Sequence, residues 1–387
     1  MPMRIFFGVG EPSGDLHGAN LIQQLRKRDA DLECVGFGGE RMQAAGAHLL
    51  YPLCNLAVVG FTRVFANLHR FVKLLWQAKK YFREHRPDAV VLIDYPGFNW
   101  WLARYAHAQG IPVFYFVPPQ IWAWAGWRIR KMRRNVDHVL CPLQFEESWY
   151  RERGVEAQYV GHPYFDELTE QQLNANFVEQ QQERLGPVIG LLPGSRDQEI
   201  DLNLSTLLES AAYIHSGRPD TRFLVACLRP DQADRIRGAV ARTNLPIEVH
   251  AGRTAEIIHL AHSCIAVSGS VSLELLYRMK PAMIIYQTNR IGHAAAKLLK
   301  TCPYICLVNL LAGKRLLPEW LSRHLDPERV GSPILDWLND YRLYKQVRDE
   351  MEELRTRVLK PGACSRVADR IMEVLTTTEK KRDRLAA

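Results

Sequence analysis

Short, continuously apolar runs alternate repeatedly with longer amphipathic stretches along this sequence. Strands that are apolar at every position, rather than at every second one, are typical of parallel sheets covered by helices on both faces. Two such series follow one another, separated by a polar stretch over Glu167–Arg184 that is rich in Gln and Asn. The sequence therefore predicts an α/β chain with two doubly wound domains.

The expected elements can be assigned by residue range. The first series has predicted strands at Arg4–Val9, Cys34–Phe37, Ala89–Ile93, Val113–Val117, Val136–Cys141 and Gln158–Val160, and predicted helices at Asp15–Lys27 and Phe65–Phe82. The second has predicted strands at Val188–Leu192, Phe223–Leu228, Ile247–Val249, Ser263–Val267 and Ala282–Tyr286, and beyond Pro318 the chain is predicted to be helical. We expect domains over residues 1–166 and 187–345, and a helical segment over residues 346–387 that packs back on the first domain or on a partner.

Composition narrows the class of protein. Hydrophobic residues make up 47% and charged residues 24% of the 387 residues, which is globular composition. The eight cysteines are scattered without a C-x-x-C pair, so we expect reduced thiols rather than disulfides or a zinc site. The first apolar run is broken by Gly8 and Gly10 and followed by Glu11, unlike a signal peptide, and no run is long enough to span a bilayer. A cytoplasmic protein, soluble or peripherally bound to a membrane, is expected.

Positive charge is concentrated in two places. The net charge is +8, yet the segment Phe61–Arg86 alone carries +6 and Trp122–Arg134 carries +5, which leaves about −3 for the rest. Indole rings beside cations are expected where a protein meets anionic headgroups, but they can also stack the bases of single-stranded nucleic acid. Composition leaves both readings open. The candidate surface residues are Arg63, Arg70, Lys73, Trp122, Trp124, Trp127 and Arg128.

Ligands of doubly wound sheets bind beyond the carboxyl ends of the strands, so the loops that follow strands are the candidate sites. The loop Gly8–Asp15 is not a G-x-G-x-x-G motif, because its third glycine comes one residue late. It is either a glycine-rich turn with Ser13 or Asp15 as a helix cap, or a loop whose backbone approaches a sugar or phosphate, with His17 one turn into the helix.

Asp94 directly follows the predicted strand Ala89–Ile93. A carboxylate at that position lies at the mouth of the site, where partial desolvation can raise its pKa toward a range useful for a general base. The alternative is that Asp94 only caps the next helix or fixes the turn.

Two loops of the second domain have the features of a diphosphate site. Gly194-Ser195-Arg196 combines helix-terminal amides with a guanidinium, and Ser268-Gly269-Ser270 exposes amides one turn before Glu274, which could accept the hydroxyls of a ribose. A Ser/Gly turn before a helix is common by itself. Two such loops in one α/β domain favour a nucleotide-diphosphate site.

Taken together, these segments resemble the lipid-A-disaccharide synthase family, GT-B glycosyltransferases of lipid A biosynthesis. The resemblance runs from about Arg4 to about residue 320 and is carried by seven motifs in order: Gly10-Glu-Pro-Ser-Gly-Asp15, Ile93-Asp-Tyr-Pro-Gly-Phe-Asn99, Pro118-Pro-Gln-Ile-Trp-Ala-Trp124, Gly161-His-Pro163, Leu192-Pro-Gly-Ser-Arg196, Ser268-Gly-Ser-Val-Ser-Leu-Glu274 and Asn309-Leu-Leu-Ala-Gly313.

The resemblance implies two Rossmann-like domains facing across a cleft and an inverting enzyme. The reaction would join UDP-2,3-diacylglucosamine to 2,3-diacylglucosamine 1-phosphate, forming the β-1,6-linked disaccharide 1-phosphate and UDP with no metal or other cofactor. It implies Asp94 as the base on the acceptor 6-hydroxyl, Arg196 on the donor phosphate, Glu274 with the Ser268-Gly269 turn around UDP, and Asn309 near the donor.

The resemblance also implies a place of action, the inner-membrane surface of a Gram-negative-type bacterium with its anionic phospholipid, and no nucleic-acid partner. Whether the enzyme forms oligomers stays open. Residues of the cleft loops that could assist Asp94 are Glu11, Ser13, Gly14, His17 and His162.

Three positions depart from the family pattern. Many members carry a second acid where Gly97 stands, the usual small-Thr-Ala turn is Ser270-Val271-Ser272, and the usual Pro-Glu-x-x-Gln ends in Ser322. The first departure removes a two-carboxylate mechanism at that spot.

Two other functions compete with this reading. A UDP-sugar epimerase, or a glycosyltransferase with a soluble acceptor, would have the same fold and predicts no dependence on lipid. A nucleic-acid binder would use the same basic clusters and predicts steeply salt-dependent binding to RNA or DNA.

Overall fold

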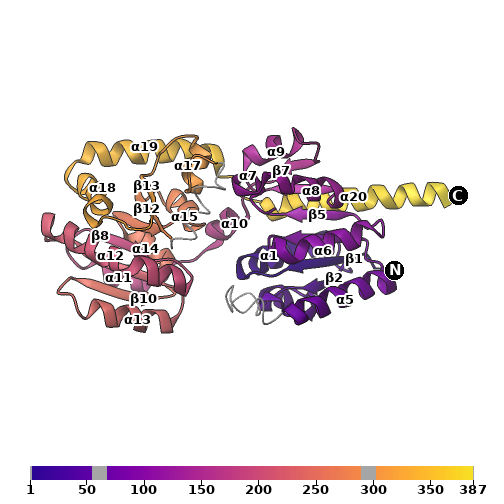
Figure 1. The fold of residues 1–387 in the computed structure, drawn as a ribbon, viewed down its shortest axis with the longest axis horizontal. Helices are drawn as coiled ribbons and strands as arrows, with labels where there is room; N and C mark the ends of the chain where they lie inside the picture. Colours follow the sequence, from indigo (N-terminus) through magenta and orange to yellow (C-terminus); the bar gives the residue numbers. More distant parts are fainter. Residues whose placement is uncertain (1, 55–67, 289–301, 387) are drawn as a thin grey trace. The chain divides into compact units, whose positions relative to one another are not determined.

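The computed structural model describes residues 2–54, 68–288 and 302–386, drawn in Figure 1. They form two compact units: Met1–Glu167 together with Lys360–Ala387, and Leu168–Leu359 between them. Each unit is built on its own parallel sheet. Two doubly wound α/β units are what the sequence predicts, and this prediction is confirmed.

The first unit contains seven strands among its described residues. They are β1 (Arg4–Val9), β2 (Glu33–Phe37), β3 (His48–Tyr51), β4 (Ala89–Ile93), β5 (Val113–Phe116), β6 (His138–Cys141) and β7 (Ala157–Tyr159). The helices are α1 (Pro12–Arg28), α2 (Glu40–Ala44), α5 (Leu68–His85), α6 (Pro96–His107), α7 (Ile121–Trp124), η1 (Gly126–Arg128), α8 (Ile129–Asn135), α9 (Gln144–Arg151) and α20 (Ala363–Ala386), and α10 (Pro163–Glu170) crosses into the second unit.

The strands of the first sheet are ordered β3-β2-β1-β4-β5-β6-β7, so the order reverses between β1 and β4. Successive side chains of a strand point to opposite faces, and both faces are buried here. Ile5, Phe7 and Val9 pack with α1 and α20 on one face, while Phe6 packs with α5 on the other. This two-sided burial is the physical reason for the continuously apolar runs.

The second unit contains six strands among its described residues. They are β8 (Val188–Leu192), β9 (Arg222–Cys227), β10 (Ile247–Ala251), β11 (Ser263–Val267), β12 (Ala282–Gln287) and β13 (Glu319–Ser322). The helices are α11 (Ala175–Gln182), α12 (Asp197–Gly217), α13 (Pro230–Val240), α14 (Thr254–Leu260), α15 (Val271–Tyr277), α17 (Leu307–Ala312), α18 (Pro327–Asn339) and α19 (Tyr341–Val358).

The second sheet has the order β10-β9-β8-β11-β12-β13, with its reversal between β8 and β11. Ile189 and Leu191 of β8 pack with α12, α13 and α18 on one face. On the other face Gly190 leaves room for α14 and the neighbouring strand, because a Cβ there would come within 2.7 Å of the Cys264 Sγ. Each sheet therefore offers a reversal point at which a ligand can bind beyond the strand ends.

Three expectations about the chain path differ from the structure. The short edge strands β3 and β13 are not among the predicted strands, and β13 falls where the chain beyond Pro318 is predicted to be helical. The chain returns to the first unit at Lys360 rather than at residue 346. The reason is that α19 buries Met351, Leu354 and Val358, so this helix belongs to the second unit.

The returning segment is fastened to the first unit at the start of α20. Asp166 accepts hydrogen bonds from the amides of Gly362, Ala363 and Cys364, at 2.6, 3.1 and 3.0 Å. Farther along, Arg28 on α1 pairs with Asp369 at 2.7 Å.

No described helix is both long and apolar enough to cross a membrane.

Candidate active site

Asp94 lies at the reversal point of the first sheet. The last residues of the two central strands, Val9 and Ile93, are register partners, and Asp94 is the next residue after β4. Its side chain is half-buried. The structure therefore places the predicted base where ligands of doubly wound sheets bind.

The backbone of Asp94 is held in an uncommon conformation. Asp94 and Tyr95 have φ values of 46° and 47°, in the left-handed region, which carries a cost for non-glycine residues. Asn99 Nδ2 and the Tyr115 hydroxyl both donate to the Asp94 carbonyl at 2.7 Å, and Asn99 Nδ2 also reaches the Gly8 carbonyl at 2.9 Å. These buried groups fix the turn and so aim the carboxylate.

The glycine-rich loop is explained largely by packing. A Cβ at Gly10 would come within 2.2 Å of the Tyr95 ring, and one at Gly14 within 3.0 Å of Val9. Ser13 is exposed and Glu11 is half-buried at the start of α1. Neither Ser13 nor Asp15 caps α1.

Asp15 has a different structural role. It is buried inside α1 and accepts from the amides of Gly39, Arg41 and Met42, at 2.8, 3.0 and 3.1 Å. It therefore caps α2, a long-range contact that the local sequence pattern does not contain.

His17 and His162 form a pair of neutral imidazoles. Burial lowers the pKa of His17 to about 4, although the nearby Asp166 carboxylate opposes this, and burial together with His17 lowers the pKa of His162 to about 3. His162 Nδ1 accepts from the Tyr164 amide at 3.2 Å. At neutral pH neither ring carries charge, so the pair supplies no positive charge to a ligand.

We expect this pair to destabilise the fold in acid. The unfolded chain binds protons below about pH 6.5, whereas folded His17 binds them only near pH 4, so stability falls as the pH drops between these values. The loss for His17 alone is on the order of 2 kcal/mol between pH 7 and pH 5. Urea unfolding of the wild type and of His17→Leu at both pH values measures it.

The comparison of the wild type with His17→Leu separates the effect of His17 from that of Glu146, whose titration changes stability with pH in the opposite direction. Burial raises the pKa of Glu146 to about 7. The stability that depends on protonated Glu146 is therefore present at low pH and lost as the pH rises from about 4.5 to 7. An equal pH dependence in wild type and His17→Leu would contradict the prediction.

In the second unit, the loop between β8 and α12 already holds a carboxylate. Glu199 Oε2 accepts from the amides of Ser195 and Arg196 at 2.9 and 3.2 Å, and Glu199 Oε1 lies 3.2 Å from Arg196 Nη1. Gly194 has a φ of 109° and passes so close to Glu199 that a Cβ would lie 2.6 Å from that residue's Cβ. The groups predicted to hold phosphate thus contact an anionic side chain in a capping box, and their phosphate-binding role stays a prediction.

The second predicted loop follows β11. The Ser268 hydroxyl donates to the Ile305 carbonyl at 2.9 Å, while Gly269 and Ser270 are exposed with open space around Gly269. Glu274 is almost fully buried one turn later and pairs with Arg278 at 2.9 Å. The turn is accessible to a ligand, and the Glu274 carboxylate is oriented by the guanidinium of the half-buried Arg278.

Asn309 has a structural role instead of an exposed one. It is fully buried, its Nδ2 donates to the Leu317 carbonyl at 2.8 Å and to Glu319 Oε2 at 3.1 Å, and its Oδ1 accepts from the Leu317 amide. Glu319 in turn accepts from the Ile305 and Cys306 amides. Asn309 therefore supports the loop that meets Ser268, and its place near the donor stays a prediction.

The candidate surface residues divide into exposed and buried ones. Trp122 is buried and its Nε1 donates to Glu146 at 2.8 Å, so its prediction as a surface residue is wrong. The Trp122 indole packs α7 against α9 instead. Arg70 and Lys73 are exposed on α5, and Arg63 lies outside the described residues.

Exposed aromatic side chains and cations occur on α5, α6, α7 and η1 of the first unit, and buried residues of α5, α6 and α7 belong to one core cluster. Arg128 lies over the rings of Trp124 and Trp127, at 4.6 and 5.0 Å from their centroids, and these side chains are 43% and 65% exposed. On α5, Trp76 is 68% exposed, and Trp101 on α6 is 46% exposed. We call the set of Val72, Lys73, Trp76, Trp101, Trp124, Trp127 and Arg128 the tryptophan surface.

Comparison with known proteins decides the family. Residues 5–371 match the family model for lipid-A-disaccharide synthetase. A lipid-A-disaccharide synthase of Myxococcus xanthus is 33% identical over 97% of this chain and 98% of its own length, and one of Methylobacillus flagellatus is 35% identical over 90% and 92%. The chain belongs to the lipid-A-disaccharide synthase family. It is thus an enzyme, a glycosyltransferase of lipid A biosynthesis.

Solved structures with the same fold are more distant in sequence. A Staphylococcus aureus MnaA–UDP structure matches with a TM-score of 0.66 at 12% identity, and the calicheamicin glycosyltransferase CalG4 with 0.62 at 15%, each over 97% of this chain and 97% and 98% of their own. This likeness places the chain in the GT-B fold class.

Two features of this synthase-family member depend on its own sequence. Gly97 is exposed, and a Cβ there would meet nothing within 4 Å. A side chain is therefore sterically allowed at this position. Among the described residues, no three or more His, Cys, Asp or Glu side chains are grouped as a metal site.

Proposed function

We propose that this enzyme transfers the diacylglucosamine of UDP-2,3-diacylglucosamine to the 6-hydroxyl of 2,3-diacylglucosamine 1-phosphate, with inversion. The observation that carries the proposal is the half-buried carboxylate of Asp94 at the reversal point of the first sheet, in a chain of this family. The ligand class on the donor side is a UDP-sugar.

The reaction needs one base and one stabilised leaving group. Asp94 takes the proton of the acceptor 6-hydroxyl. The oxygen of that hydroxyl bonds to C1 of the donor sugar, and the bond from C1 to the UDP oxygen breaks. The departing diphosphate gains negative charge, which Arg196 and the amides of Ser195 and Arg196 are suited to stabilise. Glu274 accepts the ribose hydroxyls, and His17 and His162 remain neutral neighbours within the first unit.

We propose that the chemistry is independent of metal ions. The cationic and amide groups around Arg196 supply the charge that a divalent cation provides in many other nucleotide sites. This proposal and the substrate assignment are tested in one assay.

The assay supplies the purified chain with both acylated substrates in detergent micelles and detects the disaccharide 1-phosphate by mass spectrometry. We expect product at equal rates with and without excess EDTA. Loss of product in EDTA would overturn metal independence. Turnover of UDP-N-acetylglucosamine alone, without an acceptor, would instead favour an epimerase.

We further propose that the tryptophan surface binds the inner membrane, where the acylated substrates reside. Val72 and Trp76 lie four residues apart on α5 and are exposed beside Lys73, as on a helix that meets headgroups. Arg128 stacked on two exposed indoles places a cation at the same level as amphipathic rings. Charge complementarity selects anionic phospholipid.

We expect the triple variant Trp76→Ala, Trp127→Ala and Arg128→Ala to bind phosphatidylglycerol vesicles at least about tenfold more weakly, because two indoles and about 1 kcal/mol of attraction per cation are lost. Cosedimentation measures the binding. The matched control replaces exposed aliphatic residues of the second unit, Leu185→Ala with Leu228→Ala. Equal binding by the triple variant and control would contradict the proposal, and retention of single-stranded oligonucleotide at physiological salt would favour the nucleic-acid alternative.

A further inference from the structure

The carboxylate proposed to accept the ribose hydroxyls is held by a second residue close to it in the chain. Glu274 lies on α15, and Arg278 directly follows the end of that helix. The Arg278 amide donates to the Glu274 carbonyl at 2.9 Å, and Arg278 Nε donates to Glu274 Oε1, also at 2.9 Å. The backbone and the side chain of Arg278 therefore both contact Glu274, and the side chain fixes one oxygen of its carboxylate.

This ion pair is largely removed from water. The side chains of Arg278 and Glu274 are 9% and 4% exposed. Every other described ion pair of the second unit between residues three or four apart has at least one side chain that is 36% or more exposed. Removal of one partner from a buried pair leaves an uncompensated charge, whereas an exposed pair contributes little. The orientation of the Glu274 carboxylate therefore depends strongly on Arg278.

The guanidinium of Arg278 is bound at a second point. Arg278 Nη2 donates to Gln171 Oε1 at 2.8 Å, and Gln171 directly follows α10. Because a guanidinium is planar, bonds from Nε and Nη2 to two different residues restrict it to one orientation. Arg278 thus connects the Glu274 carboxylate to a segment outside α15.

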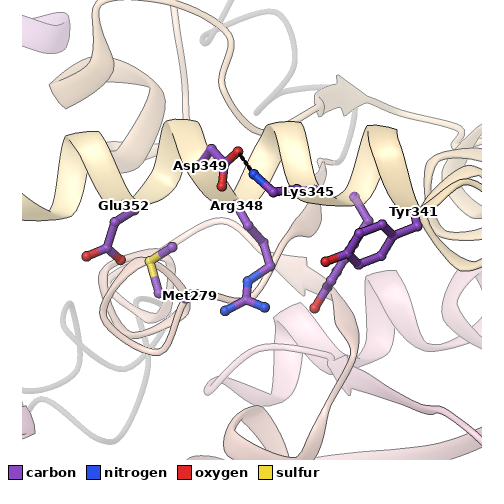
Figure 2. Close-up of a pocket in the computed structure, with 7 residues that line it drawn as sticks. Met279, Tyr341, Lys345, Arg348, Asp349 and Glu352 are labelled. Atoms are coloured by element: carbon purple, nitrogen blue, oxygen red, sulfur yellow. Dashed lines mark hydrogen bonds and ion pairs between the residues drawn. The ribbon is translucent and has the colours of Figure 1, made fainter.

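The end of α15 is also supported by α19. Arg355 Nη1 on α19 donates to the Tyr277 carbonyl at 3.1 Å. Figure 2 shows Met279, the residue after Arg278, lining a pocket together with Glu352 and other residues of α19. The Arg278 side chain is instead directed to Glu274 and Gln171. With its backbone supported in this way, Arg278 can hold the carboxylate in a fixed position.

We propose that Arg278 is a positioning residue of the donor site, through which this enzyme selects ribonucleotides over 2′-deoxyribonucleotides. The inference rests on the proposed function, in which Glu274 accepts the ribose hydroxyls. Arg278 acts on the nucleotide only through the Glu274 carboxylate, which its guanidinium holds in one orientation for the 2′-hydroxyl. A hydrogen bond to a charged acceptor is stronger than one between neutral groups, and it requires that the acceptor be aimed at its donor.

Titration calorimetry with UDP and with 2′-deoxy-UDP tests the inference. In the wild type we expect UDP to bind at least about tenfold more tightly than 2′-deoxy-UDP, the effect of one hydrogen bond to a charged group. In Arg278→Met we expect this ratio to fall below about threefold, because UDP binds more weakly while the affinity for 2′-deoxy-UDP is unchanged. Arg278→Lys keeps the charge but not the planar group, so an intermediate ratio is expected.

The matched control is Arg253→Met. Arg253 is also paired with a nearly buried carboxylate of the second unit, that of Glu256 on α14, at 3.3 Å, and its loss should leave the ratio at the wild-type value. A wild-type ratio in Arg278→Met or in Arg278→Lys would overturn the proposal. Equal weakening of both nucleotides would also overturn it, because a purely structural role predicts that result. Should Arg278→Met fail to fold, Arg278→Lys decides, since it retains a cation beside Glu274.

The nucleotide ratios can fail independently of the proposed function. They require neither lipid nor acceptor, whereas the proposed reaction is judged by formation of the disaccharide 1-phosphate. Equal affinity of the wild type for UDP and 2′-deoxy-UDP would overturn the positioning role of Arg278 even if product forms. Absence of product would overturn the proposed function, and a lowered ratio in Arg278→Met would then still support the positioning role at the nucleotide site.

Discussion

Replacement of Asp94 by Asn is expected to lower kcat by about 10²- to 10⁴-fold, the usual contribution of a general base. The substitution keeps the size of the side chain. It also keeps the turn, because Asn99 and Tyr115 bind the backbone carbonyl of Asp94 and not its carboxylate, and Asn tolerates the left-handed φ of this position. The loss would therefore report chemistry, and UDP affinity should be unchanged.

Two control variants separate the base from its support. Tyr115→Phe removes one hydrogen bond to the Asp94 carbonyl and leaves the carboxylate in place, so a loss of less than about tenfold is expected. Gly97→Asp places a second acid close to Asp94 in the chain, at a position with open space. Turnover near the wild-type rate in Asp94→Asn would refute the base assignment, and a gain in Gly97→Asp would show that a second carboxylate contributes.

The central strands of both sheets could be predicted because a strand that is buried on both faces is apolar at every position. Ala89–Ile93 and Ser263–Val267 are predicted with the bounds that the structure has. The edge strands β3 and β13 lack this continuous apolar pattern. Each has four residues that are mostly half-buried, and each pairs on one side only. Their place in the sheet is decided by tertiary pairing, which a local pattern does not contain.

The site was predictable where a residue follows a strand and not where a partner is distant in sequence. The location of Asp94 and Arg196 in loops that follow strands could be predicted from position alone, and their roles stay predictions. Trp122 looks like its exposed neighbours, and only the fold brings it to Glu146, 24 residues away. Asn309 is similarly assigned by motif, whereas its contacts to Leu317 and Glu319 give it a structural role.

The contacts of Glu199 could be predicted from the local sequence. A Glu three residues after the N-cap is the pattern of a capping box, in which the side chain returns to the first amides of the helix. In this loop those amides are the ones proposed to bind phosphate. On that proposal, the donor diphosphate would compete with the Glu199 carboxylate for the same groups.

Arg196→Ala is expected to weaken UDP binding by about tenfold to a hundredfold, because a charge-assisted hydrogen bond to phosphate contributes about 1.5–3 kcal/mol. Arg196 is largely exposed and its ion pair is with Glu199, so its loss should leave the fold intact. Titration calorimetry with UDP measures the change. Arg237→Ala, which removes an exposed arginine paired with Asp234 on α13, should bind UDP as the wild type does.

Glu199→Gln tests the competition in the opposite direction. The neutral amide can still cap the helix, as Gln232 does for α13, where its Oε1 accepts from the Leu228 and Arg229 amides at 3.3 Å. With the competing charge removed, UDP should bind more tightly, by up to about tenfold. Weaker binding in Arg196→Ala together with unchanged binding in Glu199→Gln would mean that phosphate contacts Arg196 without displacing Glu199. Unchanged affinity in both variants would remove this loop from the donor site, because neither its guanidinium nor its carboxylate would then sense the diphosphate.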